Sequence, residues 1–168
     1  MPTPRANRQP VSESFALDKL SSLCAASEHC RQDVVDKCAA WGLDADAANR
    51  VADRLVAERF VDDSRYAPLF VRDKARFSGW GPVKVRQQLK IKGIDSDTIA
   101  DAIAAFDAAE WDDILRHALQ QKLRTTKKDD PRKLYAALVR FALQRGFEYQ
   151  AIRHALQDIV SSTDNDDF

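Results

Sequence analysis

The chain has 168 residues, of which 45% are hydrophobic and 31% charged, and these proportions are those of ordinary globular proteins rather than of collagen-like or wholly disordered chains. A chain of this length forms one domain or a few small units. No apolar run approaches the roughly 18 residues of a membrane-spanning helix, and the basic N-terminus lacks the apolar stretch of a secretory signal. We therefore expect a cytoplasmic protein that does not associate with membranes.

Motifs that carry catalysis or hold metals are missing from the sequence. The cysteines, Cys24, Cys30 and Cys38, form no CxxC pair and have no metal-ligand spacing, so reduced thiols are the simplest expectation. No phosphate-binding loop, GxSxG elbow or HExxH pair occurs either. The sequence therefore predicts neither catalysis nor a metal site.

The formal net charge of zero conceals a strong segregation of charge along the chain. Residues 59–92 carry nine Lys/Arg against three Asp/Glu, a net charge of +6, whereas residues 93–110 carry five acids and no base. A basic block of this kind suits phosphates or an acidic protein surface as partners, although a solvated helix face has the same composition.

Apolar residues recur every three or four positions between the glycines and prolines, and no segment alternates with the period of two that half-buried strands require. The sequence therefore predicts an all-α protein. The predicted helices, in chain order, span residues 14–26, 28–41, 44–59, 62–77, 81–92, 95–106, 108–126, 130–145 and 148–160.

Three glycines mark an internal repeat. Residues 92–103 (KGIDSDTIADAI) align with residues 145–156 (RGFEYQAIRHAL) without a gap, and a weaker third copy begins near Gly42. We expect each glycine, Gly42, Gly93 and Gly146, to end a helix in the left-handed conformation, where a Cβ would clash. The last two helices of each repeat resemble a helix-turn-helix in outline.

Three such repeats in tandem predict an elongated, curved body in which each unit has three helices. The predicted divisions are a disordered lead-in at 1–13, three-helix units at 14–59, 60–107 and 108–160, and an acidic disordered tail at 161–168.

The basic residues of the middle unit gather on helix faces. At about 100° per residue, Arg65, Arg72 and Arg76 fall on one line of their helix, which we expect to face outward. On the next helix, Arg86 and Lys90 share a face. The two basic faces are therefore candidates for one binding surface.

Aromatic residues of the same helix form a second line. Tyr66, Phe70 and Phe77 lie about 120° from the arginines, and we expect them to pack inward. Trp80 stands on a glycine-flanked turn, where it is either a core anchor or an exposed residue for stacking or for an interface. Pro68 lies inside the predicted helix and should kink or shorten its first turn.

The run from residue 60 to residue 94 resembles the central signature of the RecX family, bacterial regulators of the RecA recombinase. In that signature an acidic pair with arginine and an aromatic residue precedes a Gly-x-Gly-Pro-like turn, a basic and apolar helix, and a Lys-Gly-Ile turn. The likeness is carried by Asp62, Asp63, Arg65, Tyr66, Gly79, Gly81, Pro82, Lys84, Val85, Leu89, Lys92, Gly93 and Ile94. We also expect Phe70 to be a structural residue of this signature.

The C-terminal unit is similar to the family's last unit through Arg145, Gly146 and Phe147, and the whole likeness covers about residues 15–160. Departures are Lys84, where arginine is usual, and Pro68.

The resemblance implies three tandem three-helix units, no cofactor, and binding to the filament that RecA forms on DNA. Family members lie in the filament's groove or cap its growing end, and lower ATP hydrolysis and strand exchange in recombination, DNA repair and the SOS response. The protein would contact single-stranded or double-stranded DNA, either directly or through the filament. The expected contact residues are Arg65, Arg72, Arg76, Trp80, Lys84, Arg86, Lys90 and Lys92.

Two other functions stay open from the residues alone. A stand-alone helix-turn-helix DNA-binding regulator would discriminate between duplexes and usually dimerise. The chain has no evident dimerisation helix or heptad seam, so we expect a monomer. A helical scaffold for some other protein is the third possibility, and in that case the basic residues would be dispensable.

Overall fold

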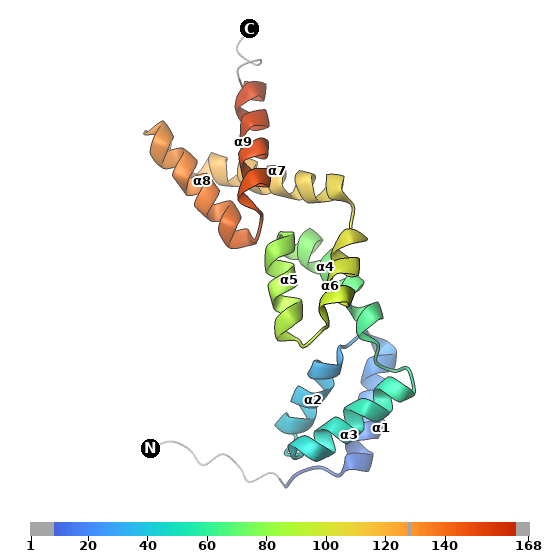
Figure 1. The fold of residues 1–168 in the computed structure, drawn as a ribbon. Helices are drawn as coiled ribbons and strands as arrows, with labels where there is room; N and C mark the ends of the chain where they lie inside the picture. The colour runs from blue at the N-terminus through green and yellow to red at the C-terminus, as the bar shows by residue number, and fades with distance from the viewer. Residues whose placement is uncertain (1–8, 128, 164–168) are drawn as a thin grey trace, which may run out of the picture. The chain divides into compact units, whose positions relative to one another are not determined.

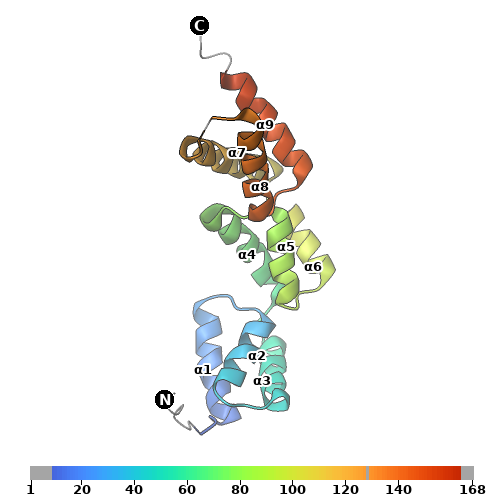
Figure 2. The ribbon, with the colours of Figure 1, turned by 90° about the vertical axis from the view of Figure 1, so that its left-hand side faces the viewer.

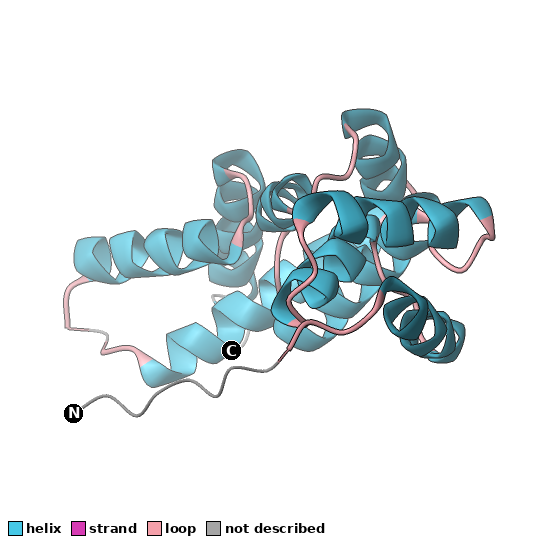
Figure 3. Cartoon of the chain, turned by 90° about the horizontal axis from the view of Figure 1, so that it is seen from below, coloured by secondary structure: helices cyan, strands magenta, loops and turns pink. Residues whose placement is uncertain are grey.

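The computed structural model (Figure 1) describes residues 9–127 and 129–163, and within these ranges it contains helices and loops but no strand (Figure 3). The all-α prediction is confirmed, and each predicted helix has a counterpart whose ends differ by three residues or fewer. The helices are α1 (Glu13–Ala26), α2 (Arg31–Ala40), α3 (Ala45–Ala57), α4 (Asp63–Ser78), α5 (Pro82–Ile91), α6 (Ser96–Ala104), α7 (Ala108–Thr125), α8 (Pro131–Arg145) and α9 (Tyr149–Thr163).

Carboxylates and glycines set the ends of several of these helices. The Asp44 carboxylate accepts a hydrogen bond from the amide of Ala47 at 2.8 Å, and such a cap stabilises a helix by about 1 kcal/mol because the amide has no helical partner. Gly42, Gly93 and Gly146 have φ angles of 89°, 74° and 91°, so the predicted left-handed glycine turns are confirmed.

The described chain divides into two compact units, with the boundary inside α4 between Tyr66 and Ala67. The first unit holds α1, α2, α3 and the first turn of α4. Its core lies between α1, α2 and α3, and its buried residues are Ala16, Leu20, Cys24, Val34, Cys38, Ala48, Val51, Ala52, Leu55 and Val61.

Two cysteines, Cys24 and Cys38, belong to this first core. All three cysteines are buried and none forms a disulfide, as expected for reduced thiols. Burial raises the pKa of Cys24 and of Cys38, because an apolar environment disfavours the thiolate. Neither thiol is therefore set up as a nucleophile.

Residues 9–13 differ from the disordered lead-in expected for them. The amide of Val11 donates a hydrogen bond to the carbonyl of Trp41 at 3.2 Å, and Val11 packs against the first core. Residues 1–8 lie outside the described part of the chain. At the other end, α9 continues to Thr163, into the segment expected to be a tail, and residues 164–168 lie outside the described part.

The second unit contains the rest of α4 together with α5 to α9. Helices α4–α6 and α7–α9, predicted as separate units, therefore lie in one compact body from Ala67 onward. In its last three helices, α7, α8 and α9 pack on one another (Figure 2) around a second core of Leu115, Leu119, Leu138, Ala142, Phe147, Ile152, Ala155 and Leu156.

The prediction that Phe77 packs inward is wrong, because 84% of its surface is exposed. The buried line of α4 consists of small residues, Ala67, Val71 and Ala75, each fully buried. On the helix, this buried line is turned by about one residue from the line of aromatic residues. Small side chains are buried there because helices that pack closely leave little room between their backbones. Phe70 stays half-buried beside it.

None of the helices within residues 9–127 and 129–163 is long and apolar enough to span a membrane. Among the described side chains, no three potential metal ligands gather at one point.

Candidate functional site

The turn between α4 and α5 folds Trp80 back against α4. Gly79 turns the chain with a φ of 65°, and the amide of Trp80 donates a hydrogen bond to the carbonyl of Lys74 at 3.1 Å. The Trp80 ring then meets the Phe70 ring edge to face, with 6.4 Å between the ring centroids. Trp80 is half-buried, so it is neither a fully buried anchor nor a freely exposed ring.

Three lysine ammonium groups surround these two rings. The Nζ of Lys74 lies 4.9 Å from the Trp80 centroid, and that of Lys84 lies 4.6 Å from it. The Nζ of Lys92 lies 5.9 Å from the Phe70 centroid. We call Phe70, Lys74, Trp80, Lys84 and Lys92 the lysine–aromatic cluster.

The cluster concentrates positive charge on a partly apolar platform. Each cation–ring contact stabilises the position of its ammonium group by roughly 0.5 to 1 kcal/mol at an exposed site. The rings themselves carry no net charge, so they do not cancel the charge of the lysines. Such an arrangement suits phosphates or carboxylates on a partner. Sequence reasoning found Trp80, Lys84 and Lys92 but missed Lys74, although its spacing of four residues from Phe70 on one helix pointed to contact.

The predicted arginine line is exposed, but its members are engaged in ion pairs. Arg76 binds Glu110 of α7 at 2.5 Å, and Arg72 binds Asp73 at 3.0 Å. The Arg76 guanidinium lowers the pKa of Glu110 below its usual value through their hydrogen bond.

Arg65 belongs to the first unit. Its guanidinium binds Glu28 at 2.8 Å and also donates to the carbonyl of Arg59. Surface ion pairs contribute roughly 0 to 1 kcal/mol, so an external anion can replace such a partner at little cost.

Arg86 and Lys84 do not form one surface. They stand about 200° apart around α5, since successive residues turn by about 100°. Lys84 lies over Trp80, whereas Arg86 lines a separate cavity of about 400 Å³ with Phe106 and Trp111. Lys90 is exposed on α5.

The other signature residues hold the structure in place. The Asp63 carboxylate accepts a hydrogen bond from the amide of Arg31 at 3.0 Å, and Asp62 accepts one from the amide of Ser64 at 2.8 Å. Tyr66 is half-buried. The remaining apolar members are buried in the second unit, and they are Leu89, Ile94 and Phe147.

Gly81 and Gly146 bring the turn before α5 against the turn after α8. The amide of Gly81 donates to the carbonyl of Arg145 at 2.7 Å, and the amide of Val83 donates to the carbonyl of Gly146 at 2.9 Å. The Arg145 side chain donates to the carbonyl of Ser78 at 2.8 Å. These bonds fix the turn that carries Trp80 to the last three helices.

Comparisons with known proteins match this chain to RecX proteins. A family model of the second three-helix domain of RecX matches residues 62–103, and a model of the third matches residues 110–156. A regulatory protein RecX from Xanthomonas axonopodis pv. citri (strain 306) is 34% identical over 155 residues, covering 92% of this chain and 93% of that protein. Another from Stenotrophomonas maltophilia (strain R551-3) is 30% identical over 155 residues, covering 92% of each.

Two solved structures share the fold. The crystal structure of a regulatory protein RecX superposes with a TM-score of 0.77 at 19% identity, covering 86% of this chain and 71% of that one. RecX from Lactobacillus salivarius superposes with a TM-score of 0.73 at 20% identity, covering 87% of this chain and 95% of that one. From these matches, and above all from relatives at 30% identity or more over nearly its whole length, this chain belongs to the RecX family of regulatory proteins.

Proposed function

We propose that this chain binds the filament that the RecA recombinase forms on DNA, and that it lowers filament growth, ATP hydrolysis and strand exchange. It acts as a monomer, needs no cofactor and catalyses no reaction. Family membership supports RecA as the target. The lysine–aromatic cluster supports the mode of binding, because it gathers three lysine ammonium groups around two aromatic rings, and such a group suits a polyanionic surface.

The cluster is the observation that carries the proposal. Lys74 of α4 and Lys84 of α5 both lie against the Trp80 ring, at 4.9 Å and 4.6 Å from its centroid, so their charges add at one place. The proposed contacts outside the cluster are Arg65, Arg72, Arg76, Arg86 and Lys90, and the paired arginines among them exchange an internal carboxylate for one on the filament or for a DNA phosphate. Electrostatic contacts of this kind weaken as the salt concentration rises.

Co-sedimentation with RecA filaments on single-stranded DNA tests the proposal. The double variant Lys74→Gln/Lys84→Gln keeps the side-chain stems and removes two charges, and we expect roughly tenfold weaker binding and a shallower dependence on salt. Lys19→Gln, which removes one exposed charge from α1, is the control and should bind like the wild type. Wild-type binding by the double variant would contradict the assignment of this site.

Naked DNA distinguishes the proposed function from a stand-alone DNA-binding regulator. The same proteins are measured on single- and double-stranded oligonucleotides without RecA. Our proposal predicts that the filament binds more tightly than either oligonucleotide. Sequence-dependent binding to a duplex, with no preference for the filament, would contradict it.

A further inference from the structure

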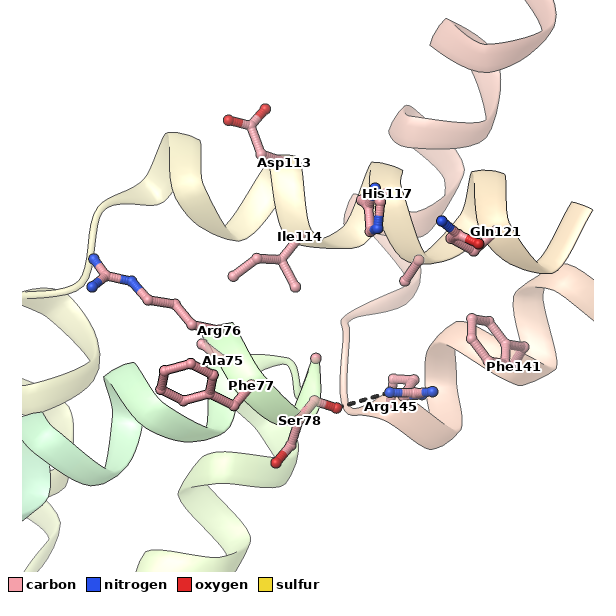
Figure 4. Close-up of a pocket in the computed structure, with 12 residues that line it drawn as sticks. Ala75, Arg76, Phe77, Ser78, Asp113, Ile114, His117, Gln121, Phe141 and Arg145 are labelled. Carbon is pink, nitrogen blue, oxygen red and sulfur yellow. Dashed lines mark hydrogen bonds between the residues drawn. The ribbon is translucent and has the colours of Figure 1, made fainter.

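A groove in the second unit lies outside the lysine–aromatic cluster. It has a volume of about 460 Å³ and is bordered by the last turn of α4, by α7 and by α8 (Figure 4). Ile114 projects from α7 toward the last turn of α4, His117 lines the groove from α7, and Phe141 and Arg145 line it from α8 (Figure 4). Its lining is partly apolar and partly charged, with Arg76 and Arg145 as cations and Asp113 as a carboxylate.

Phe77 stands on the α4 side of this groove with 84% of its surface exposed. Its neighbour Ala75 is fully buried and already fills the contact between α4 and the interior. The Phe77 ring consequently serves no visible purpose in the packing of the unit. A large aromatic side chain left in water loses the stabilisation that burial would provide, and aromatic residues of this kind are typical anchors of protein interfaces.

The α8 side of the groove is positive. The ring of Phe141 lies near two cations, with the Nζ of Lys122 of α7 at 5.4 Å and the guanidinium carbon of Arg145 at 5.1 Å from its centroid. Of the four cations of α8, Arg145 is the one that lines the groove, and the helix carries no carboxylate. The charge of this wall is complementary to an acidic partner.

We propose that this groove docks an acidic protein segment that places an apolar side chain beside Phe77, with its carboxylates toward α8. The inference rests on the proposed function, because the segment is then presented by the RecA subunits of the filament. The apolar lining favours protein over the DNA backbone, which is charged throughout. The groove therefore adds a protein contact to the cationic contact of the lysine–aromatic cluster.

The test compares Phe77→Ala with Ile91→Ala, which removes another highly exposed apolar side chain, 74% exposed, from outside the groove. Both variants should fold, since both side chains lie in solvent. We expect Phe77→Ala to weaken binding to RecA, alone and in the filament, by about tenfold, whereas Ile91→Ala leaves it unchanged. Binding to a single-stranded oligonucleotide should be the same for both variants.

The dependence on salt provides a second readout. Loss of Phe77 removes an apolar contact, so the slope of affinity against salt should stay at its wild-type value. Lys122→Gln should weaken binding and flatten that slope. Lys127 is an exposed lysine beyond α7, so Lys127→Gln should leave both the affinity and the slope unchanged.

The outcomes separate the two proposals. If the wild type does not bind RecA at all, the proposed function fails and the inference with it. If the wild type binds and Phe77→Ala binds equally well, the inference alone is overturned. A loss confined to oligonucleotide binding would assign the groove to nucleic acid and overturn it as well.

Discussion

Gly81 and Gly146 lie against each other so closely that neither has room for a side chain. A Cβ on Gly81 would come within 2.5 Å of the carbonyl carbon of Gly146 and 2.7 Å of the amide nitrogen of Phe147. A Cβ on Gly146 would come within 2.5 Å of the amide nitrogen of Lys84. The two turns therefore meet backbone to backbone, and this contact holds the α4–α5 turn, with Trp80, against α8 and α9.

Gly81→Ala should destabilise the second unit. The φ of Gly81 is −84°, which alanine adopts without strain, so the whole effect comes from the clash with the Gly146 turn. We expect a loss of roughly 1 to 3 kcal/mol in the free energy of unfolding, measured by chemical denaturation. Gln87→Ala, on the exposed face of α5, should change it by less than about 0.5 kcal/mol. Equal stabilities for the two variants would contradict the tight contact.

Arg59→Gly should stabilise the first unit. Arg59 is the non-glycine residue with a positive φ, 63°, among the described residues, and the left-handed conformation costs an L-residue roughly 1 to 2 kcal/mol. Arg59 accepts the hydrogen bond from Arg65 through its backbone carbonyl and not through its side chain, so that bond survives the substitution. Arg59→Ala keeps the Cβ and should show no comparable gain, which separates backbone strain from the lost charge in thermal unfolding.

The Arg76–Glu110 pair predicts a dependence of stability on pH. The pKa of Glu110 is lowered from 4.5 in the folded protein, so its contribution is complete above that value and is lost as the pH falls through the lower folded pKa. Glu110→Gln mimics the protonated carboxyl at every pH. The difference in Tm between wild type and Glu110→Gln should therefore shrink as the pH is lowered from 7 to about 3.

Glu148→Gln is the control for this experiment, because Glu148 is exposed and forms no ion pair among the described contacts. Its Tm should follow that of the wild type more closely than Glu110→Gln does. A difference between wild type and Glu110→Gln that stays constant with pH would rule out the carboxylate as its source.

Trp80 should contribute to filament binding through its ring rather than through its size alone. Trp80→Ala removes the platform under Lys74 and Lys84, and we expect binding to fall by roughly tenfold. Trp80→Phe keeps an aromatic face and should recover most of the affinity in the same co-sedimentation measurement. Equal losses in both variants would argue against a cation–ring platform.

The sequence predicted the helices well, because their caps and glycine turns are local features. Asp44 caps α3 with its own side chain, and Gly146 ends α8 through its own φ, so both helix ends can be predicted from the local sequence. The same local logic failed for Phe77. Helical periodicity assigns a face to a residue, but it does not say where the neighbouring helices stop.

The candidate site was only partly predictable for a related reason. Lys84 and Lys92 were found from the family signature, but Arg76 pairs with Glu110, 34 positions away, and no sequence spacing reveals that partner. The groove beside Phe77 likewise joins α4, α7 and α8, which are brought together only by the packing of the second unit. Long-range contacts of this kind are set by tertiary structure.

The most direct test of the central claim is the steady-state ATPase of RecA on single-stranded DNA, titrated with this protein. Our account predicts that the rate falls at substoichiometric ratios and that the fall weakens in Lys74→Gln/Lys84→Gln. An unchanged rate at saturating protein, with filaments confirmed to be present, would contradict it.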